Sequence, residues 1–338
     1  GCATKEARGK RCFPASDHSF DVTDALVRHL NRKHVKIRFH ADVTQILTRE
    51  NPKLEGDSEM PLSNSSIGAA AFGKNAFDAA GHKDEKAARM ACGVRLRSGE
   101  EITADAVIVA AGGMSYPSTG STGDGYRLAK QLGLDVKEPA PSLVPFTVAQ
   151  SWPLELQGLS LKNVAVRLEN LEKNGGSGRK KKRRPVYEGF GEMLFTHFGV
   201  SGPLILSASC HADFQAHPER YLLHLDLKPA LSVEELVRRL EREFSLQPRR
   251  ELRNALKGLL PERLAQIAAQ LFAAGLPNPS AEGGADRAVY TLNEKELREL
   301  ALFLKDLVMT VTGTRGFAEA IVTRGGVSVR EINPSTME

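Results

Sequence analysis

Cysteine is scarce in this sequence, and its spacing excludes two classes of protein. The four cysteines are Cys2, Cys12, Cys92 and Cys210, and no two of them form a C-x-x-C pair. Such spacing does not suggest a zinc site, and four cysteines in 338 residues do not make a disulfide framework. We therefore expect no metal centre and a reducing, cytoplasmic location.

Long hydrophobic runs and aromatic side chains are also scarce. No apolar run approaches the roughly 20 residues that a membrane-spanning helix needs, so we expect no membrane partner. The charged N-terminal stretch lacks the apolar core of a signal peptide, and because it starts with Gly1 instead of Met, we expect that Gly1 is not the natural start. The single tryptophan, Trp152, argues against a base-stacking platform for single-stranded nucleic acid.

The positive charge of the chain is concentrated in one place. The formal net charge is +5, and without the run GRKKKRR over residues 178–184 the chain would be close to neutral. Because glycines precede the run and predicted strands flank it, we interpret it as the solvated tip of a hairpin. A nucleic-acid-binding module at Arg179–Arg184 is the alternative, although we do not expect nucleic acid as a partner.

Periodicity and turn residues indicate alternating helices and strands. We expect a helix over 21–33, a strand over 35–47, a weakly patterned insertion over 48–91, a hairpin over 93–103 and a strand over 104–111. Farther along we expect strands between 159 and 195 and over 221–228, helices over 232–275 and 293–308, and a strand-rich end. This order predicts an α/β protein, α+β overall, in which one domain is interrupted by another.

A glycine-rich stretch is the strongest local signal. Residues 110–133 read AAGGMSYPSTGSTGDGYRLAKQLG and follow the predicted strand directly. Glycines let a backbone approach a ligand closely, and the start of the following helix attracts anions. A turn without a ligand would give the same pattern. The chain contains neither G-x-G-x-x-G nor G-x-x-x-x-G-K-[ST], so the pyrophosphate fingerprint of a dinucleotide site is not among these residues.

Three further segments, together with the glycine-rich stretch, resemble those of a known protein family. They read RCFPASDHSFDVTDAL from Arg11, GEMLFTHFGVSGPLIL from Gly191 and RGGVSVREINPSTME from Arg324, and PSLVPFTV follows the glycine-rich stretch. Together, in this order, they resemble the bacterial FAD-dependent oxidoreductases of the aminoacetone oxidase family, the BaiN-like flavoproteins. The resemblance runs from about Glu6 to the last residue, with residues 48–91 as a departure.

The resemblance implies a fold and an incomplete cofactor site. Family members begin with a Rossmann strand and glycine loop and end with a flavin-contacting segment, and both lack counterparts here, so we expect the middle of such a flavoprotein. A partial FAD-binding, Rossmann-like domain is expected over 1–145, with a return over 313–338. The substrate domain inserted over 146–312 would consist of a mixed β-sheet or barrel over 146–230 and a helical part over 231–312.

The resemblance and the glycine chemistry together suggest cofactor residues. Val43, at the end of a strand, would lie near the adenine through its backbone, and the loop residues would pass close to FAD. Tyr116 is expected near the flavin, although a tyrosine in such a loop can simply anchor it. The complete set of predicted cofactor residues is Val43, Ala111, Gly112, Gly113, Tyr116, Thr122, Gly123, Gly325 and Gly326.

Three other side chains are candidates for chemistry. His197 in FTHFGVSG can move a proton near neutral pH, but a histidine between phenylalanines is also commonly a packed residue. Arg11 and Arg324 can bind a substrate carboxylate or phosphate, yet each can equally be an ordinary surface arginine. We interpret Ser201 as a helix cap, because no G-x-S-x-G surrounds it.

The sequence therefore predicts a fragment of an FAD-dependent oxidoreductase that transfers hydride to or from flavin N5 of FAD. The substrate would be a small organic molecule, with NAD(P)H or oxygen left open as second partner and the oligomeric state undetermined. We expect the chain by itself to be inactive. The alternatives are a non-catalytic remnant that no longer binds FAD and a nucleic-acid-binding module at Arg179–Arg184.

Overall fold

A computed structural model describes residues 1–7, 11–50, 89–171, 185–214, 221–275 and 284–337. These residues divide into two compact units, 1–108 and 109–337. Most of the predicted insertion and the whole basic run Arg179–Arg184 lie outside the described residues. The predicted domain boundaries at residues 145 and 312 do not coincide with this division and stay predictions.

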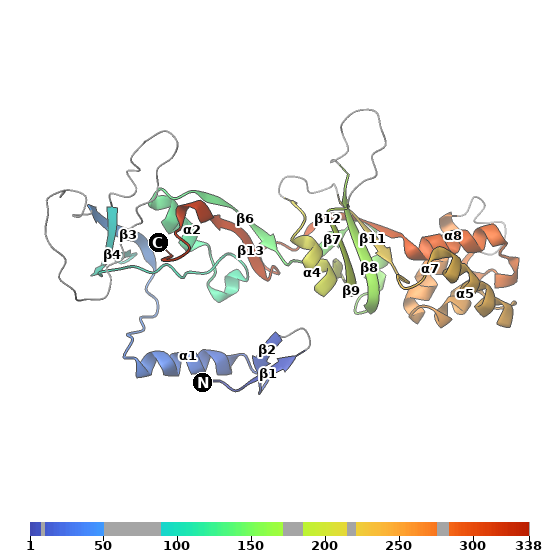
Figure 1. Ribbon diagram of the computed structural model, residues 1–338, viewed down its shortest axis with the longest axis horizontal. Coiled ribbons are helices and arrows are strands. Elements are labelled where there is room, and N and C mark those ends of the chain that lie inside the picture. The colour runs from blue at the N-terminus through green and yellow to red at the C-terminus, as the bar shows by residue number, and fades with distance from the viewer. Residues whose placement is uncertain (8–10, 51–88, 172–184, 215–220, 276–283, 338) are drawn as a thin grey trace, which may run out of the picture. The chain divides into compact units, whose positions relative to one another are not determined.

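The first unit consists of a hairpin, a helix and a three-stranded sheet (Figure 1). Its elements are β1 (Thr4–Ala7), β2 (Arg11–Pro14), α1 (Phe20–Arg32), β3 (Val43–Glu50), β4 (Arg89–Leu96) and β5 (Glu101–Thr103). The predicted hairpin forms from β4 and β5 and turns at Gly99, whose φ is 88°. Among the described residues of this unit, Ile46 and Leu96 are the buried hydrophobic side chains, and α1 buries none.

Two predicted strands differ from the structure. Residues 35–42 are not strand, so Val43 begins β3 instead of ending a strand. Residues 104–111 also form no strand, and the side chain of Ile108 is 91% exposed. A buried strand needs neighbouring strands that bind its N–H and C=O groups along its length. Among the described residues no strand pairs with this segment, although Ala104 N–H at its start donates to Cys92 C=O over 3.0 Å. All strand pairs among the described residues are antiparallel, so the expected Rossmann-like arrangement is not shown.

A closed six-stranded barrel forms the centre of the second unit, in the order β10-β7-β12-β11-β8-β9 (Figure 1). Its strands are β7 (Phe146–Val148), β8 (Ser160–Asn170), β9 (Tyr187–Thr196), β10 (Gly199–Ser201), β11 (Tyr221–Asp226) and β12 (Leu307–Thr314). Along β11 buried and half-buried residues alternate, with Tyr221, Leu223 and Leu225 inside. An alternation with a period of two places every second side chain of the strand in the barrel interior. The predicted mixed sheet or barrel is thus a closed barrel.

Helices follow and interrupt the barrel strands. They are α3 (Trp152–Glu155), α4 (Pro203–Ser209), α5 (Val233–Leu246), α6 (Leu252–Ala255), α7 (Glu262–Gly275) and α8 (Glu294–Lys305), with short 3-10 helices η4 (Leu256–Gly258), η5 (Gly284–Asp286) and η6 (Val289–Thr291). Ser232 and Asn293, the first residues of the two predicted helical ranges, cap α5 and α8 in capping boxes. Ser201 is not a cap, because it ends β10 and Gly202 precedes α4.

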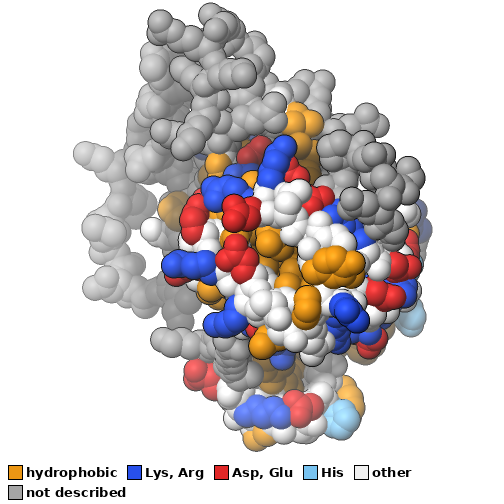
Figure 2. Space-filling model, turned by 90° about the vertical axis from the view of Figure 1, so that its right-hand side faces the viewer, with side chains coloured by type: hydrophobic (Ala, Val, Ile, Leu, Met, Phe, Trp, Pro, Cys, Tyr) orange, Lys and Arg blue, Asp and Glu red, His pale blue; other side chains and the backbone are white. Residues whose placement is uncertain are grey.

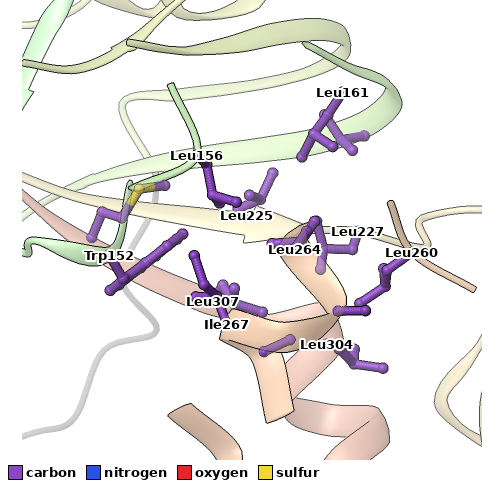
Figure 3. Packing of buried hydrophobic residues seen from close by; sticks show 14 of the residues in the cluster. Trp152, Leu156, Leu161, Leu225, Leu227, Leu260, Leu264, Ile267, Leu304 and Leu307 are labelled. Atoms are coloured by element: carbon purple, nitrogen blue, oxygen red, sulfur yellow. The ribbon is translucent and has the colours of Figure 1, made fainter. Parts of the chain in front are cut away.

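The barrel and the helices share one hydrophobic core. Figure 3 shows Trp152 and Leu156 beside Leu225 and Leu307 of the barrel, with Leu264 and Ile267 of α7 and Leu304 of α8 continuing the same cluster. Leu156, Leu225, Leu264 and Leu304 are completely buried. Packing of this kind fixes the barrel and helices as one rigid body.

A small layer at the start and end of the second unit carries the glycine-rich stretch. It contains η3 (Pro117–Thr119), α2 (Asp124–Gln131), the antiparallel pair of β6 (Val136–Ser142) and β13 (Val322–Val327), and η7 (Val329–Glu331). Its two connections to the barrel run side by side, because Ile321 N–H donates to Leu143 C=O over 3.1 Å and Arg315 N–H donates to Pro145 C=O over 3.2 Å. The layer is therefore tied to the barrel at both crossings.

All four cysteines are free thiols in the structure. Within the described ranges, no helix combines the length and apolarity required to cross a bilayer. The same ranges contain no group of three or more His, Cys, Asp or Glu side chains placed to hold a metal ion.

Candidate functional site

The glycine-rich stretch folds back on itself before it enters α2. Gly123 N–H donates to Gly113 C=O over 3.2 Å, so the two ends of the loop meet. Gly123 caps α2 with a φ of 85°, a conformation that side chains disfavour. The helix expected at the end of the glycine-rich stretch is confirmed as α2, Asp124–Gln131, and the glycine loop before it is a defined turn.

Thr323 of β13 holds this loop in place. Its Oγ1 accepts hydrogen bonds from the backbone N–H groups of Met114 (2.8 Å) and Ser115 (3.1 Å) and lies 3.0 Å from the Ser115 hydroxyl. Gly113 passes so close that a Cβ there would lie 2.6 Å from the Thr323 Oγ1. Glycine is therefore required at Gly113 by the threonine. We did not predict Thr323, although it directly precedes the predicted site residues Arg324, Gly325 and Gly326.

A cavity of about 580 Å³ opens beside the loop and α2. Two predicted cofactor residues, Thr122 and Gly123, line it together with Met114, Tyr126, Arg127, Lys130, Gln131, Glu138 and Pro139. Thr122 and Arg127 both bond the Asp124 carboxylate, over 2.9 Å each, which orders the first turn of α2. The volume lies within the range of small-molecule sites. The lining carries the cation Lys130, the carboxylate Glu138 and Arg127, which is already paired with Asp124.

The predicted pair Gly325–Gly326 lies at an irregularity in the pairing of β13 with β6. A Cβ on Gly325 would lie 2.5 Å from the Glu138 carbonyl oxygen, and one on Gly326 would lie 2.8 Å from the Tyr126 ring. Both glycines are thus required by packing within this layer. They line a separate cavity of about 440 Å³, together with Asp135, Lys137, Val327, Ser328, Val329 and Arg330.

His197 lies in the turn between β9 and β10 and is exposed, so it is not the packed residue of the alternative reading. The His197 ring packs edge to face against the Phe198 ring, with 4.9 Å between the ring centres. The Arg315 guanidinium lies over the Phe198 ring, 4.5 Å from its centre. Tyr116 N–H donates to Phe317 C=O over 3.0 Å. The short segment from Arg315 to Phe317 therefore contacts both the glycine loop and the turn that carries His197.

The remaining predicted residues are dispersed. Val43 belongs to the first unit and Tyr116 is 46% exposed at a φ of 52°. Arg324 donates to the Ala212 carbonyl oxygen (3.1 Å) and to the Asp213 carboxylate (3.2 Å), so it links β13 to the segment that follows α4. Arg11 lies in β2, and its side chain lies outside the described part of the structure.

Ala111, Gly112 and Gly113 lead into the loop, and the structure brings the backbone of Gly113 and Gly123 together. The arrangement offers a pinned backbone turn, a cavity at a helix start that Lys130 lines and, on the barrel, an exposed imidazole. A backbone turn at a helix start can bind a phosphate-bearing ligand.

Comparison with known proteins adds two findings. Residues 140–322 match the family model described as "HI0933-like protein barrel and H2TH domain", a range that covers the barrel and helical core. The chain is also similar to ribosomal RNA dihydrouridine synthase of Escherichia coli K12, with 31% identity over 71% of this chain and 52% of that protein. The corresponding enzyme of Haemophilus influenzae is 30% identical over 69% and 50% of the two chains.

A third relative has a different substrate in its name. The 3-dehydro-bile acid delta(4,6)-reductase of Clostridium scindens is 25% identical over 71% of this chain and 54% of that protein. The aligned part of this chain thus spans about half the length of each of these three curated relatives.

Proposed function

We propose that this chain, which belongs to the HI0933-like family, forms part of a flavin-dependent reductase. The observation that carries the proposal is the glycine loop, pinned by Thr323 beside a cavity at the start of α2, in a chain whose relatives include a named reductase. The family membership and the cavity support FAD as the cofactor. The activity of the whole protein, its substrate and its second partner are part of the proposal.

The residues that would hold FAD are those of the loop and the cavity. The backbone of Ala111, Gly112 and Gly113 would lie along the cofactor, while Thr122 and Gly123 at the start of α2, with Arg127 and Lys130 nearby, would face its phosphates. When bound, FAD would supply hydride transfer at flavin N5, with NAD(P)H as the source of the electrons.

The barrel would supply the substrate side of the site. His197 is exposed at the turn held by Arg315 and Phe198, and a ring nitrogen of this histidine would deliver the proton that accompanies a hydride. Arg11 and Arg324 stay candidates for binding an anionic substrate group, although Arg324 already bonds Ala212 and Asp213.

The names of the relatives indicate which kind of bond the reaction would reduce. Dihydrouridine synthesis saturates the C5=C6 bond of a uracil base, and a delta(4,6)-reductase of a 3-dehydro-bile acid saturates bonds conjugated to a ketone. Both reactions reduce a carbon–carbon double bond activated by a carbonyl group. We therefore propose such a bond as the substrate class, in place of a small organic molecule of any kind.

A flavin titration tests the cofactor site first. The purified chain is mixed with FAD, desalted and examined by visible absorbance, alongside Lys130→Gln, which removes a cation from the cavity, and Lys162→Gln, an exposed control on β8. We expect the wild type and the control to retain the flavin spectrum and Lys130→Gln to bind FAD several-fold more weakly. A colourless wild-type chain, or equal affinity in all three, would contradict the proposed site.

Nucleic acid is a second candidate partner, because two relatives act on ribosomal RNA by name and the chain carries the basic run Arg179–Arg184. This run lies outside the described residues. Removal of residues 178–184 should weaken RNA binding and reduce its dependence on salt concentration. Unchanged binding and an unchanged salt slope would remove the run from the proposal.

A further inference from the structure

A further cavity, of about 460 Å³, lies where the barrel meets the helical part. Its lining includes Gln150, Ser151, Trp152 and Glu155 on one side and Ile267 and Gln270 of α7 on the other. It shares no lining residue with the two cavities of the layer that carries the glycine-rich stretch. The cavity is therefore a separate place in the molecule, and the proposed reductase activity gives it no role.

The walls of this cavity are held in place by hydrogen bonds. The Gln150 side chain, just after β7, accepts from Thr310 N–H over 2.9 Å and donates to Thr310 Oγ1 over 3.3 Å. On the opposite side, the Arg263 guanidinium of α7 donates to the carbonyl oxygens of Glu155 and Gln157, the second over 3.1 Å. These bonds fasten the segment from β7 to α3 to both β12 and α7, so the cavity is preformed, as most small-molecule sites are.

The buried part of the lining is apolar. Trp152 is 8% exposed and Ile267 is 7% exposed, and Figure 3 shows the two side chains close together beside Leu307. The Trp152 ring also packs against the Phe195 ring, with 5.9 Å between the ring centres. A surface of this kind favours contact with the hydrocarbon part of a ligand, because the removal of apolar area from water is favourable.

Three polar side chains of the lining have no hydrogen-bond or ion-pair partner among the described residues. They are the Ser151 hydroxyl, the Glu155 carboxylate and the Gln270 amide, all on exposed residues. Ser151 is the N-cap of α3, yet its side chain makes no capping hydrogen bond. Each of these groups can accept a hydrogen bond, so the outer part of the cavity offers acceptors that the fold leaves unused.

The charge of the lining has one sign. Glu155 is its charged side chain, and its described residues include no Lys, Arg or His. The neighbouring cation Arg263 already donates to two backbone carbonyl oxygens. Figure 2 shows basic and acidic side chains interspersed over the face that it presents, so a lining without a cation is a local property. A cleft with one sign of charge attracts ligands of the opposite sign.

We propose that this cavity binds an organic amine through its ammonium group and the methylene groups next to it. An ammonium has three N–H donors and no acceptor, which matches the acceptors at Glu155, Ser151 and Gln270. The Glu155 carboxylate would accept charge-assisted hydrogen bonds, and the methylene groups would lie against Trp152 and Ile267. An anionic ligand would meet a like charge in this lining and no cation. The site requires no flavin, so it can be tested without the cofactor.

The ammonium can belong to a free amine or to a lysine side chain of another protein, and two probes separate these sources. Wild type, Glu155→Gln and the control Glu241→Gln are titrated at constant ionic strength with n-butylamine, with the peptide acetyl-Gly-Lys-Gly-amide and with uncharged n-butanol. Glu241 of α5 is exposed and does not line the cavity. Because Trp152 lines the cavity and is the only tryptophan in the chain, its fluorescence reports binding. The Tm of the three proteins should be the same, since both replaced side chains belong to exposed residues.

We expect n-butylamine to change the Trp152 fluorescence of wild type and control along a saturable curve, and Glu155→Gln to bind it at least fivefold more weakly. n-Butanol should bind more weakly than the amine and equally in all three proteins, because it carries no charge to pair with Glu155. Tighter binding of the peptide than of n-butylamine identifies a lysine of another protein as the source, and the reverse identifies a free amine. A wild type that gives no saturable response to either amine, or that binds them no better than Glu155→Gln does, would overturn the proposal.

Discussion

The two units differ in how far their apolar side chains are buried. In the barrel and helical part, residues such as Leu225, Leu240 and Leu300 are completely buried in one core. In the first unit, Phe39 is 76% exposed and Leu26 is 61% exposed. Both regions contain strands and amphipathic helices, so the difference does not lie in local structure but in what covers it.

The helices α1 and α5 illustrate this difference in burial. α1 and α5 are of similar length and both are strongly amphipathic, yet α5 buries Leu236, Leu240 and Phe244, whereas α1 buries no residue. Helical periodicity predicts that an apolar face exists, and tertiary packing decides whether it is covered. Stability should therefore be concentrated in residues 109–337.

The largest expected effect comes from the barrel core. Leu225→Ala removes a completely buried side chain that stands between Val166 and Leu307 in the sheet, and we expect it to lower the free energy of unfolding by roughly 2–5 kcal/mol. Denaturant unfolding followed by Trp152 fluorescence measures this, because the single tryptophan belongs to the same core. A loss below about 1 kcal/mol would mean that the core repacks around the gap.

The next effect concerns a buried ion pair that locks the helical part. Arg287, with its side chain 5% exposed, donates to Glu296 over 2.9 Å and to the Thr291 carbonyl oxygen over 2.9 Å. Arg287→Met leaves the Glu296 carboxylate poorly compensated, and we expect a loss of about 3 kcal/mol in the same unfolding assay. The same change at Arg298, an exposed partner of Glu234, should cost under about 1 kcal/mol.

The ion pair also predicts a dependence on pH. Burial by itself would raise the pKa of Glu296, but the hydrogen bonds from Arg287 and from the Asn293 backbone hold it below its ordinary value. A carboxylate with a lowered pKa in the folded state stabilises the fold above its ordinary pKa of about 4.3, and this contribution is lost as the pH falls further. Unfolding between about pH 6 and pH 3 should show a smaller acid-induced loss for Arg287→Met than for wild type.

A third, smaller effect belongs to the candidate site. Gly325→Ala places a Cβ 2.5 Å from the Glu138 carbonyl oxygen at a φ of 87°, and we expect a cost of about 1–3 kcal/mol. Gly120→Ala is the matched control, since its φ is 95° but nothing lies within 4 Å of an added Cβ. Comparing the melting temperatures separates the steric clash from the backbone strain, and equal losses would exclude a role for the β6 contact.

These contrasts explain how much of the fold could be predicted. The capping boxes at Ser232 and Asn293, the turn at Gly99 and the helix after Gly123 were predictable because each depends on neighbouring residues. The strand expected over 104–111 was wrong because a strand needs partners from elsewhere in the chain. The sequence predicted a mixed sheet or a barrel without deciding between them. The alternation of apolar and polar residues shows which face of a strand is buried, but not which strands lie next to it.

The candidate site follows the same rule. Thr122 and Gly123 were found from the glycine pattern and do line the cavity. Thr323 was missed because it meets Met114 and Ser115 across more than 200 positions of sequence, and no local pattern reports such a contact. From the sequence, Arg324 was a candidate anion ligand or equally an ordinary surface arginine, and only the fold brings Asp213 to it.

The smallest expected effect tests the other side of the comparison. Leu26→Ala makes in α1 the same chemical change as Leu225→Ala makes in the barrel, but the side chain is 61% exposed and alanine favours a helix at least as well as leucine. We expect a change within about 0.5 kcal/mol, measured by hydrogen exchange of the α1 amides. A loss above about 1 kcal/mol would show that Leu26 is covered in solution. The apolar face of α1 would then be a packing surface, and the contrast between the two units would lie in a contact instead of in exposure.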